Sequence, residues 1–327
     1  MINFQNCELY KVKRKRDLYY ILRATKKDVA LVLNKYVVCV NENNRLLEKP
    51  NYQLKQLQRR LLNKLYQIEF PTYVFSGIKG KSAYDNAMQH INSKYMLKLD
   101  MSKFFPNTHR DKIYNFFLKK LKMSPDVAKV CTDITTINYK EKNVYIEDGV
   151  MEFLKKKHIK TTNHLPSGTP TSQILSYLAN LDMFDEIVTF CDTHKLLYSI
   201  YVDDLTISTN RNISFEEEKQ LKAIVEKYGQ KISKKKTIRY KQNEYKKVTG
   251  FVISPNHHLV VANKTRRKIK EKISQVEDIK NIDISIKNSL IGLANFTQLS
   301  QKSAYRGLKN QLINWKILFK GEEYGKL

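Results

Sequence analysis

Short runs of β-branched and aromatic residues alternate along the chain with longer stretches in which apolar residues recur at helical spacing. The first kind of pattern predicts strands and the second predicts amphipathic helices. The predicted strands are residues 36–40, 45–48, 95–99, 197–202, 205–208, 234–240 and 248–254. The predicted helices lie within residues 8–34, 54–65, 82–90, 110–135, 174–181, 216–228 and 264–319.

Two adjacent carboxylates, Asp203 and Asp204, fall between two of these strands, at the tip of a predicted hairpin. Asp is a common turn residue, so a solvated turn is the ordinary interpretation of such a pair. A third carboxylate, Asp100, directly follows the predicted strand at residues 95–99. Three carboxylates at strand ends can hold two divalent metal ions, which stabilise the attacking and leaving oxygens of a phosphoryl transfer.

The composition narrows the choice of partner. The 327 residues are 42% hydrophobic, which is enough for a core and two or three packed subdomains. Lys and Arg total 59 against 32 Asp and Glu, so the formal charge is 59 − 32 = +27, spread along most of the chain. Such a basic globular protein needs a polyanionic partner, most often nucleic acid. A membrane surface is the alternative, but no basic amphipathic helix or apolar 18-residue run stands out.

Targeting and cysteine patterns favour the cytoplasm. The N-terminus lacks a basic region followed by an apolar run, so no signal peptide is predicted. The four cysteines are far apart in the sequence, which favours free thiols in a reducing compartment over zinc ligands or disulfides. Residues 75–82 look like a phosphate loop, but their two glycines are only three residues apart, which excludes that motif.

Three further segments bear on a possible site. Phe104 and Phe105 follow the candidate ligand Asp100, and either they line a nucleotide pocket or at least one of them is an ordinary core residue. Residues 165–173 form a loop rich in Pro, Gly and hydroxyl groups, before a helix that Thr171 or Ser172 would cap. Such a loop lets backbone approach a base pair or phosphate closely. Residues 138–162 are Lys-rich and predict an inserted peripheral element.

Several motifs occur in the order found in the palm of reverse transcriptases, and the chain resembles that family over about residues 35–320. They are Asp100-x-x-x-Phe-Phe, Leu-Pro-Ser-Gly-Thr-Pro-Thr-Ser, Tyr-Val-Asp-Asp and Lys236-Thr237. Two more segments resemble signatures of bacterial retron reverse transcriptases, which are linked to handling a structured RNA. These are Asn86-Ala87-Met88-Gln89-His90 and Val248-Thr249-Gly250.

The resemblance implies an α+β right-hand polymerase with fingers, an antiparallel palm sheet and a helical thumb. The implied subdomains are N-terminal helices at 1–34, fingers at 35–94, palm at 95–250 with an inserted fingers or peripheral segment at about 107–163, and thumb at 251–327. The basic helices after Lys264 would then contact phosphates without reading sequence.

The resemblance also implies roles for individual residues. Asp100, Asp203, Asp204 and the carbonyl of Met101 would bind two Mg²⁺ ions, and Lys236 would donate a proton to the leaving pyrophosphate. Arg45 would bind the triphosphate and Phe105 would exclude a ribose 2′-OH. Ser167 and Gly168 would complete the nucleotide site, although many relatives carry Gln where Ser167 stands. The residues implied in RNA handling are Asn86, Ala87, His90, Val248, Thr249 and Gly250.

The family further implies a cognate non-coding RNA that the enzyme partly copies, deoxynucleotide substrates, a branched RNA–DNA product and a partner effector protein in phage defence. Two alternatives remain. One is another bacterial reverse transcriptase, of the abortive-infection or diversity-generating type. The other is a non-catalytic scaffold that binds RNA and an effector, against which the three carboxylates Asp100, Asp203 and Asp204 argue.

Overall fold

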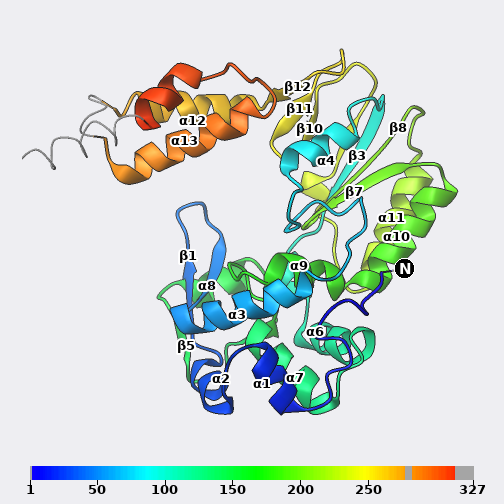
Figure 1. The fold of residues 1–327 in the computed structure, drawn as a ribbon. Helices are drawn as coiled ribbons and strands as arrows, with labels where there is room; N and C mark the ends of the chain where they lie inside the picture. The colour runs from blue at the N-terminus through cyan, green and yellow to red at the C-terminus, as the bar shows by residue number, and fades with distance from the viewer. Residues whose placement is uncertain (1, 277–281, 314–327) are drawn as a thin grey trace, which may run out of the picture. The chain divides into compact units, whose positions relative to one another are not determined.

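The computed structural model describes residues 2–276 and 282–313, which fall into two compact units (Figure 1). Of the described residues, the first unit comprises 2–81 and 97–239, and the second comprises 82–96, 240–276 and 282–313. The chain therefore leaves the first unit, contributes one short segment to the second, and returns. This division differs from the predicted subdomains, because residues 82–94 of the predicted fingers pack with the C-terminal unit and the later boundary falls at 239/240.

Several helices of the first unit bury their apolar residues in one hydrophobic core. The helix α3 buries five leucines on one face, as its spacing predicts, and Asn51 caps its first turn. These helices are α1 (Lys15–Ile21), α2 (Lys26–Val32), α3 (Tyr52–Leu65), α6 (Arg110–Asn115), the π-helical turn η1 (Phe116–Lys120) and α7 (Pro125–Thr135). They agree with the predicted helices of residues 8–34, 54–65 and 110–135.

A three-stranded sheet with the order β2-β1-β5 lies in the same unit. The strand β1 (Tyr36–Val40) pairs antiparallel with β2 (Leu46–Pro50) and parallel with β5 (Val144–Ile146). The Lys-rich segment 138–162 supplies β5 and the helix α8 (Val150–Lys156), whose Val150 and Leu154 are buried, so it joins the strands of the predicted fingers. A short pair, β4 (Ile137–Asn138) and β6 (Asn163–His164), closes the segment.

A four-stranded sheet with the order β7-β8-β3-β9 carries the candidate carboxylates. Its strands are β7 (Leu197–Tyr201), β8 (Asp204–Thr209), β3 (Tyr95–Asp100) and β9 (Ile238–Tyr240). The predicted strand at 234–240 starts late, because Lys234–Lys236 form the 3₁₀ turn η2. The associated helices are α5 (Phe104–Asn107), α9 (Ser172–Leu178), α10 (Leu181–Thr193) and α11 (Phe215–Lys227).

The second unit combines a helix from its early segment with a β-meander and two basic or amphipathic helices. Its elements are α4 (Ala83–Gln89), β10 (Lys246–Val248), β11 (Phe251–Ile253), β12 (Leu259–Val261), α12 (Asn263–Ile273) and α13 (Ile284–Gln298). The predicted single strand 248–254 is wrong: Thr249 and Gly250 form a turn, and β10 pairs back on β11. Of the predicted helical stretch 264–319, residues 277–281 and 314–319 lie outside the described residues.

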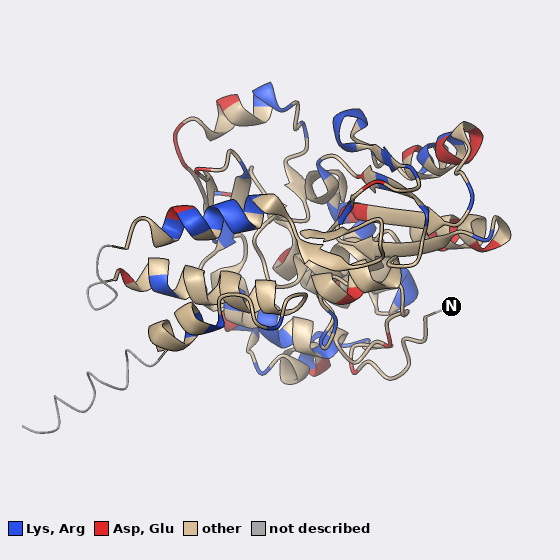
Figure 2. Cartoon of the chain, turned by 90° about the horizontal axis from the view of Figure 1, so that it is seen from above, with Lys and Arg blue, Asp and Glu red and all other residues tan. Residues whose placement is uncertain are grey.

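The predicted α+β class is confirmed by this mixture of helices with largely antiparallel sheets. Positive charge is spread over most of the described chain, as Figure 2 shows, and is not gathered at one end. Within the described ranges, we found no helix with both the length and the apolar composition needed to cross a bilayer.

Candidate active site

Backbone hydrogen bonds bring Asp100 and Asp203 together at one end of the four-stranded sheet. The Met101 N–H donates to the carbonyl oxygen of Asp203 over 2.8 Å, and the Ser233 N–H donates to that of Asp100 over 2.8 Å. Asp203 lies in the β7–β8 turn and Asp204 is the first residue of β8. The prediction that both aspartates lie at the hairpin tip is therefore corrected by one residue.

The turn itself is strained. Tyr201 pairs with Asp204, so Val202 and Asp203 form a two-residue turn. Val202 has a φ of 56°, in the left-handed region that a β-branched residue rarely adopts. Such a conformation costs on the order of 1–3 kcal/mol and persists only where the surroundings impose it. Strain of this kind is characteristic of functional turns.

Two of the three carboxylates, Asp203 and Asp100, are costly to ionise. Burial, and then the nearby Asp100 and Asp204, raise the pKa of Asp203 to about 6. Burial also raises the pKa of Asp100, where the attraction of Lys236 opposes it and the charge of Asp204 adds to it. Carboxylates with raised pKa values beside other carboxylates favour a positively charged ligand.

Two lysines of the chain partly supply that positive charge. Lys236 Nζ lies 2.9 Å from Asp100 Oδ2, and Lys98 Nζ lies 3.5 Å from Asp204 Oδ2. Lys236 was predicted from its motif, whereas Lys98 was not. A period of two on β3 places Lys98 on the same side as Asp100, so the strand pattern offered a clue.

The aspartates suit a hard cation, although they do not form a tight cluster. Among residues 2–276 and 282–313, no group of three or more His, Cys, Asp or Glu side chains is gathered closely enough to hold a metal ion. Asp100 Oδ1, however, is buried and has no hydrogen-bond partner. A buried carboxylate oxygen without a donor is costly, and a divalent cation with oxygen ligands would satisfy it.

The aromatic pair after Asp100 divides into two roles. Phe104 is buried and its ring packs edge-on against Phe184, so it is a core residue. Phe105 is only partly buried, and its ring lies 6.2 Å from that of Phe104. Of the two, Phe105 is thus the one able to touch a substrate.

The remaining predicted nucleotide residues lie on two segments that contact each other. Arg45 is exposed just before β2, at the end of the β1–β2 turn. Ser167 donates its N–H to Glu48 Oε2 on β2 over 2.7 Å, and its hydroxyl donates to the carbonyl oxygen of Leu46 over 2.8 Å. Gly168 has a φ of 86°. Thr171 is the N-cap of α9, but its side chain makes no capping bond, contrary to the prediction.

The two retron-like signatures meet inside the second unit. Asn86 Nδ2 donates to Thr249 Oγ1 over 3.4 Å, and Thr249 Oγ1 donates to the carbonyl oxygen of Ala83 over 2.8 Å. Asn86, Ala87, His90 and Val248 are all buried. Burial lowers the pKa of His90 to about 3, so its ring is neutral at physiological pH. These buried side chains are placed to hold the unit together, and Thr249 and Gly250 are only partly buried.

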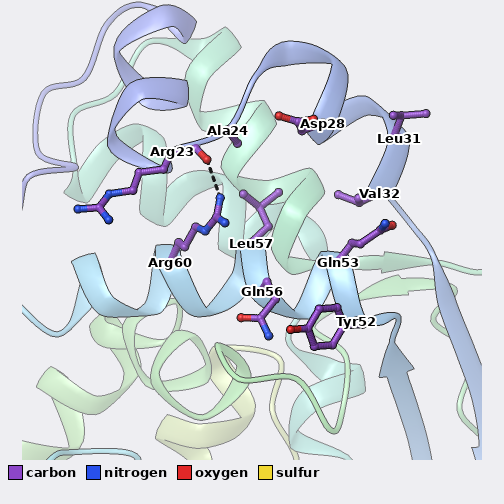
Figure 3. A pocket seen from close by; sticks show the side chains of 10 residues that line it. All are labelled: Arg23, Ala24, Asp28, Leu31, Val32, Tyr52, Gln53, Gln56, Leu57 and Arg60. Carbon is purple, nitrogen blue, oxygen red and sulfur yellow. Dashed lines mark hydrogen bonds between the residues drawn. The ribbon is translucent and has the colours of Figure 1, made fainter.

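A separate pocket of about 390 Å³ in the first unit contains none of the predicted site residues (Figure 3). Its lining residues come from α2, α3 and the turn before α2. Arg60 crosses it and donates to the carbonyl oxygen of Arg23 over 2.6 Å, where the backbone φ is 48°. The guanidinium therefore stabilises this turn.

Comparison with known sequences finds similarity to reverse transcriptases. Residues 25–253 match the family described as reverse transcriptase (RNA-dependent DNA polymerase). The chain is 28% identical over 260 residues to the retron Ec83 reverse transcriptase of Escherichia coli, a match that covers 76% of this chain and 78% of that protein. It is 27% identical over 237 residues to the retron Ec86 reverse transcriptase of Escherichia coli, covering 71% of this chain and 65% of that protein.

The retron Se72 reverse transcriptase of Salmonella heidelberg (strain 579083-10) is 24% identical over 237 residues, covering 70% of this chain and 55% of that protein. Among solved structures, telomerase from Candida albicans in complex with a fragment of telomeric RNA aligns with a TM-score of 0.48 and 11% identity, over 90% of this chain and 56% of that one.

The family match covers well over half of the chain, and the sequence relatives are retron enzymes, which confirms the resemblance seen in the motifs. The chain therefore belongs to the reverse transcriptase family of RNA-dependent DNA polymerases and is related to the bacterial retron enzymes.

Proposed function

We propose that this protein is a retron-type RNA-directed DNA polymerase that copies part of a structured non-coding RNA into a branched RNA–DNA product. In this proposal, deoxynucleotides are its substrates and an effector protein acts with it in phage defence. The observation that carries the proposal is the set of carboxylates Asp100, Asp203 and Asp204 at the ends of the adjacent strands β3 and β8, with one buried oxygen of Asp100 lacking a donor. The formal charge of +27 supports a nucleic-acid partner.

Two Mg²⁺ ions bound by Asp100, Asp203, Asp204 and the Met101 carbonyl would supply the charge that activates the primer hydroxyl and neutralises the triphosphate. The chain's own residues would position the carboxylates and donate a proton. The strained turn, where the Asp203 carbonyl oxygen accepts from the Met101 N–H just after β3, would position the carboxylates before substrate binds. Lys236, paired with Asp100, would donate a proton to the leaving pyrophosphate.

The other proposed roles concern the incoming nucleotide. Phe105 would lie under the sugar and exclude a 2′-OH, which favours deoxynucleotides. Arg45 is exposed, and its planar guanidinium suits two-point binding of a phosphate. The proposal leaves Asn86, Ala87, His90 and Val248 an indirect part in RNA handling, since their burial supports a role in shaping the second unit.

The first test is Asp203→Asn, assayed for Mg²⁺-dependent DNA synthesis on an RNA template and for RNA binding. The variant removes a charge and should abolish synthesis while RNA affinity stays close to that of the wild type. Asp148→Asn is the matched control, because Asp148 is exposed and follows β5, which belongs to a different sheet from the one that carries the aspartates. Undiminished synthesis by Asp203→Asn would refute the metal assignment, and a wild-type protein that binds RNA without any synthesis would favour the scaffold alternative.

A second test concerns the retron type. The full chain is purified from cells that contain its native locus, and the bound nucleic acid is sequenced after treatment with ribonuclease and with deoxyribonuclease. One RNA species joined to a DNA complementary to part of it supports the proposal. DNA copied from many unrelated RNAs would favour another type of bacterial reverse transcriptase.

A further inference from the structure

A buried carboxylate connects the fingers strand β2 to the loop that carries Ser167 and Gly168. Glu48 is 0% exposed, in a chain where most charged groups face water. Its Oε1 accepts from the Tyr139 hydroxyl over 2.6 Å and lies 2.8 Å from His164 Nε2. Its Oε2 accepts from the Ser167 N–H over 2.7 Å.

These contacts keep Glu48 charged in the interior. Burial alone would raise the pKa of Glu48, but the charge and hydrogen bond of His164, with the bonds from Tyr139 and Ser167, hold it below its usual range. His164 is also 0% exposed, so the pair is shielded from solvent. A buried polar pair adds little net stability compared with apolar residues of the same volume, whereas it fixes geometry through directed hydrogen bonds.

The geometry fixed in this way involves two proposed nucleotide contacts. The Glu48 N–H donates to the carbonyl oxygen of Ser167 over 3.1 Å, so backbone and side chain both hold the loop. A Cβ added at Gly168 would lie 3.6 Å from the Glu48 carbonyl oxygen, which shows how closely the two backbones approach. Arg45 precedes Glu48 by three residues on the same hairpin.

We propose that Glu48 is a positioning residue for the incoming nucleotide: with His164 and Tyr139 it fixes the Ser167–Gly168 loop relative to the hairpin that carries Arg45. This inference rests on the proposed function, because Arg45, Ser167 and Gly168 are assigned to the nucleotide there. Glu48 itself does not touch the substrate. Glu48 acts on the reaction by fixing the distance between the Ser167–Gly168 loop and the hairpin that carries Arg45.

The test is Glu48→Gln in the full-length chain, with steady-state kinetics in deoxynucleotide at a fixed RNA template–primer. Glutamine keeps the size of the side chain but presents an amide donor to neighbours that already donate, so the loop shifts. We expect the KM for deoxynucleotide to rise between about ten- and a hundredfold, while kcat at saturating nucleotide and RNA affinity change by less than about threefold. Glu147→Gln is the control, since Glu147 is exposed just after β5 and should leave KM unchanged.

A second variant covers the case in which Glu48→Gln does not fold. Tyr139→Phe keeps the carboxylate and its pair with His164 and removes one donor, so it should raise the same KM by about threefold to tenfold. If Glu48→Gln folds and has the wild-type KM for deoxynucleotide, the inference is overturned. If Glu48→Gln does not fold, a wild-type KM for Tyr139→Phe overturns it instead. A parallel loss of kcat, RNA affinity and melting temperature in the variant that folds would also overturn it, because that result describes a purely structural residue. A wild-type protein without DNA synthesis would instead refute the proposed function.

Discussion

Gly250, the last residue of the second retron-like signature, provides a sharp test of how the second unit is built. Its φ is 95°, and an added Cβ would lie 3.1 Å from Phe296 Cζ on α13. The Phe296 ring stacks on Phe251 with centroids 4.5 Å apart, so it cannot move away without losing that contact. Gly250→Ala should therefore combine backbone strain with overpacking.

Both contributions can be estimated. Placing alanine in a left-handed conformation costs roughly 1–2 kcal/mol, and forcing an extra methyl group into a packed site costs about 1–3 kcal/mol. Together they should lower the free energy of unfolding of the second unit by about 2–5 kcal/mol. Gly149→Ala is the control, because Gly149 has a φ of 77° and no atom within 4 Å of its added Cβ. It should cost about 1–2 kcal/mol.

Urea unfolding of the full chain, with amide hydrogen exchange to assign the loss to residues 82–96 and 240–276, measures the difference. Phe296→Leu combined with Gly250→Ala should recover about 1–2 kcal/mol relative to the sum of the two single changes. Equal costs for Gly250→Ala and Gly149→Ala would show that Phe296 does not press on this turn, and the packing argument would fail.

Three other results are expected. Phe105→Ala should raise ribonucleotide incorporation relative to deoxynucleotide incorporation, measured in competition on one template, and unchanged sugar selectivity would remove Phe105 from that role. The logarithm of RNA affinity should fall steeply and linearly with the logarithm of salt concentration, by roughly 0.7 per phosphate contact on single strands; a flat response would mean that the +27 charge does not serve RNA binding. Glu217, which accepts from Arg211 over 3.0 Å and caps α11 with Ser214, has its pKa lowered to about 2 chiefly by that hydrogen bond. Glu217→Gln should therefore destabilise the fold by about 1–2 kcal/mol above pH 5, and the difference from the wild type should vanish as the pH falls from about 4.5 to 2.

The elements that bury a stripe of their own residues were predicted correctly from the sequence. The helix α3 and the strand β1 are examples, because one has apolar residues at helical spacing and the other is a short β-branched run. The strand β5 was missed, since it is three residues long, lies in a Lys-rich stretch and pairs with a strand more than 100 residues away in sequence.

Turns formed by residues that disfavour the turn conformation could not be predicted from the sequence either. Thr249 has a φ of 44° beside Gly250 at 95°, which is the two-residue turn with both central residues left-handed. Threonine is unfavourable there, so the run of β-forming residues on both sides read as one strand. The carboxylates were predicted because motifs mark them, whereas Glu48 and Lys98 belong to no motif and acquire their partners only through the fold.

The early segment of the second unit has a consequence for how the protein is made. Met96 and Ala87 belong to the core that Phe251 completes, yet Phe251 is synthesised 251 − 96 = 155 residues after Met96. At a translation rate of about 5–20 residues per second, Phe251 is synthesised roughly 8–31 s after Met96. During that interval the apolar residues of the early segment are uncovered, so the rate of translation and the supply of chaperones should influence how much active protein a cell obtains.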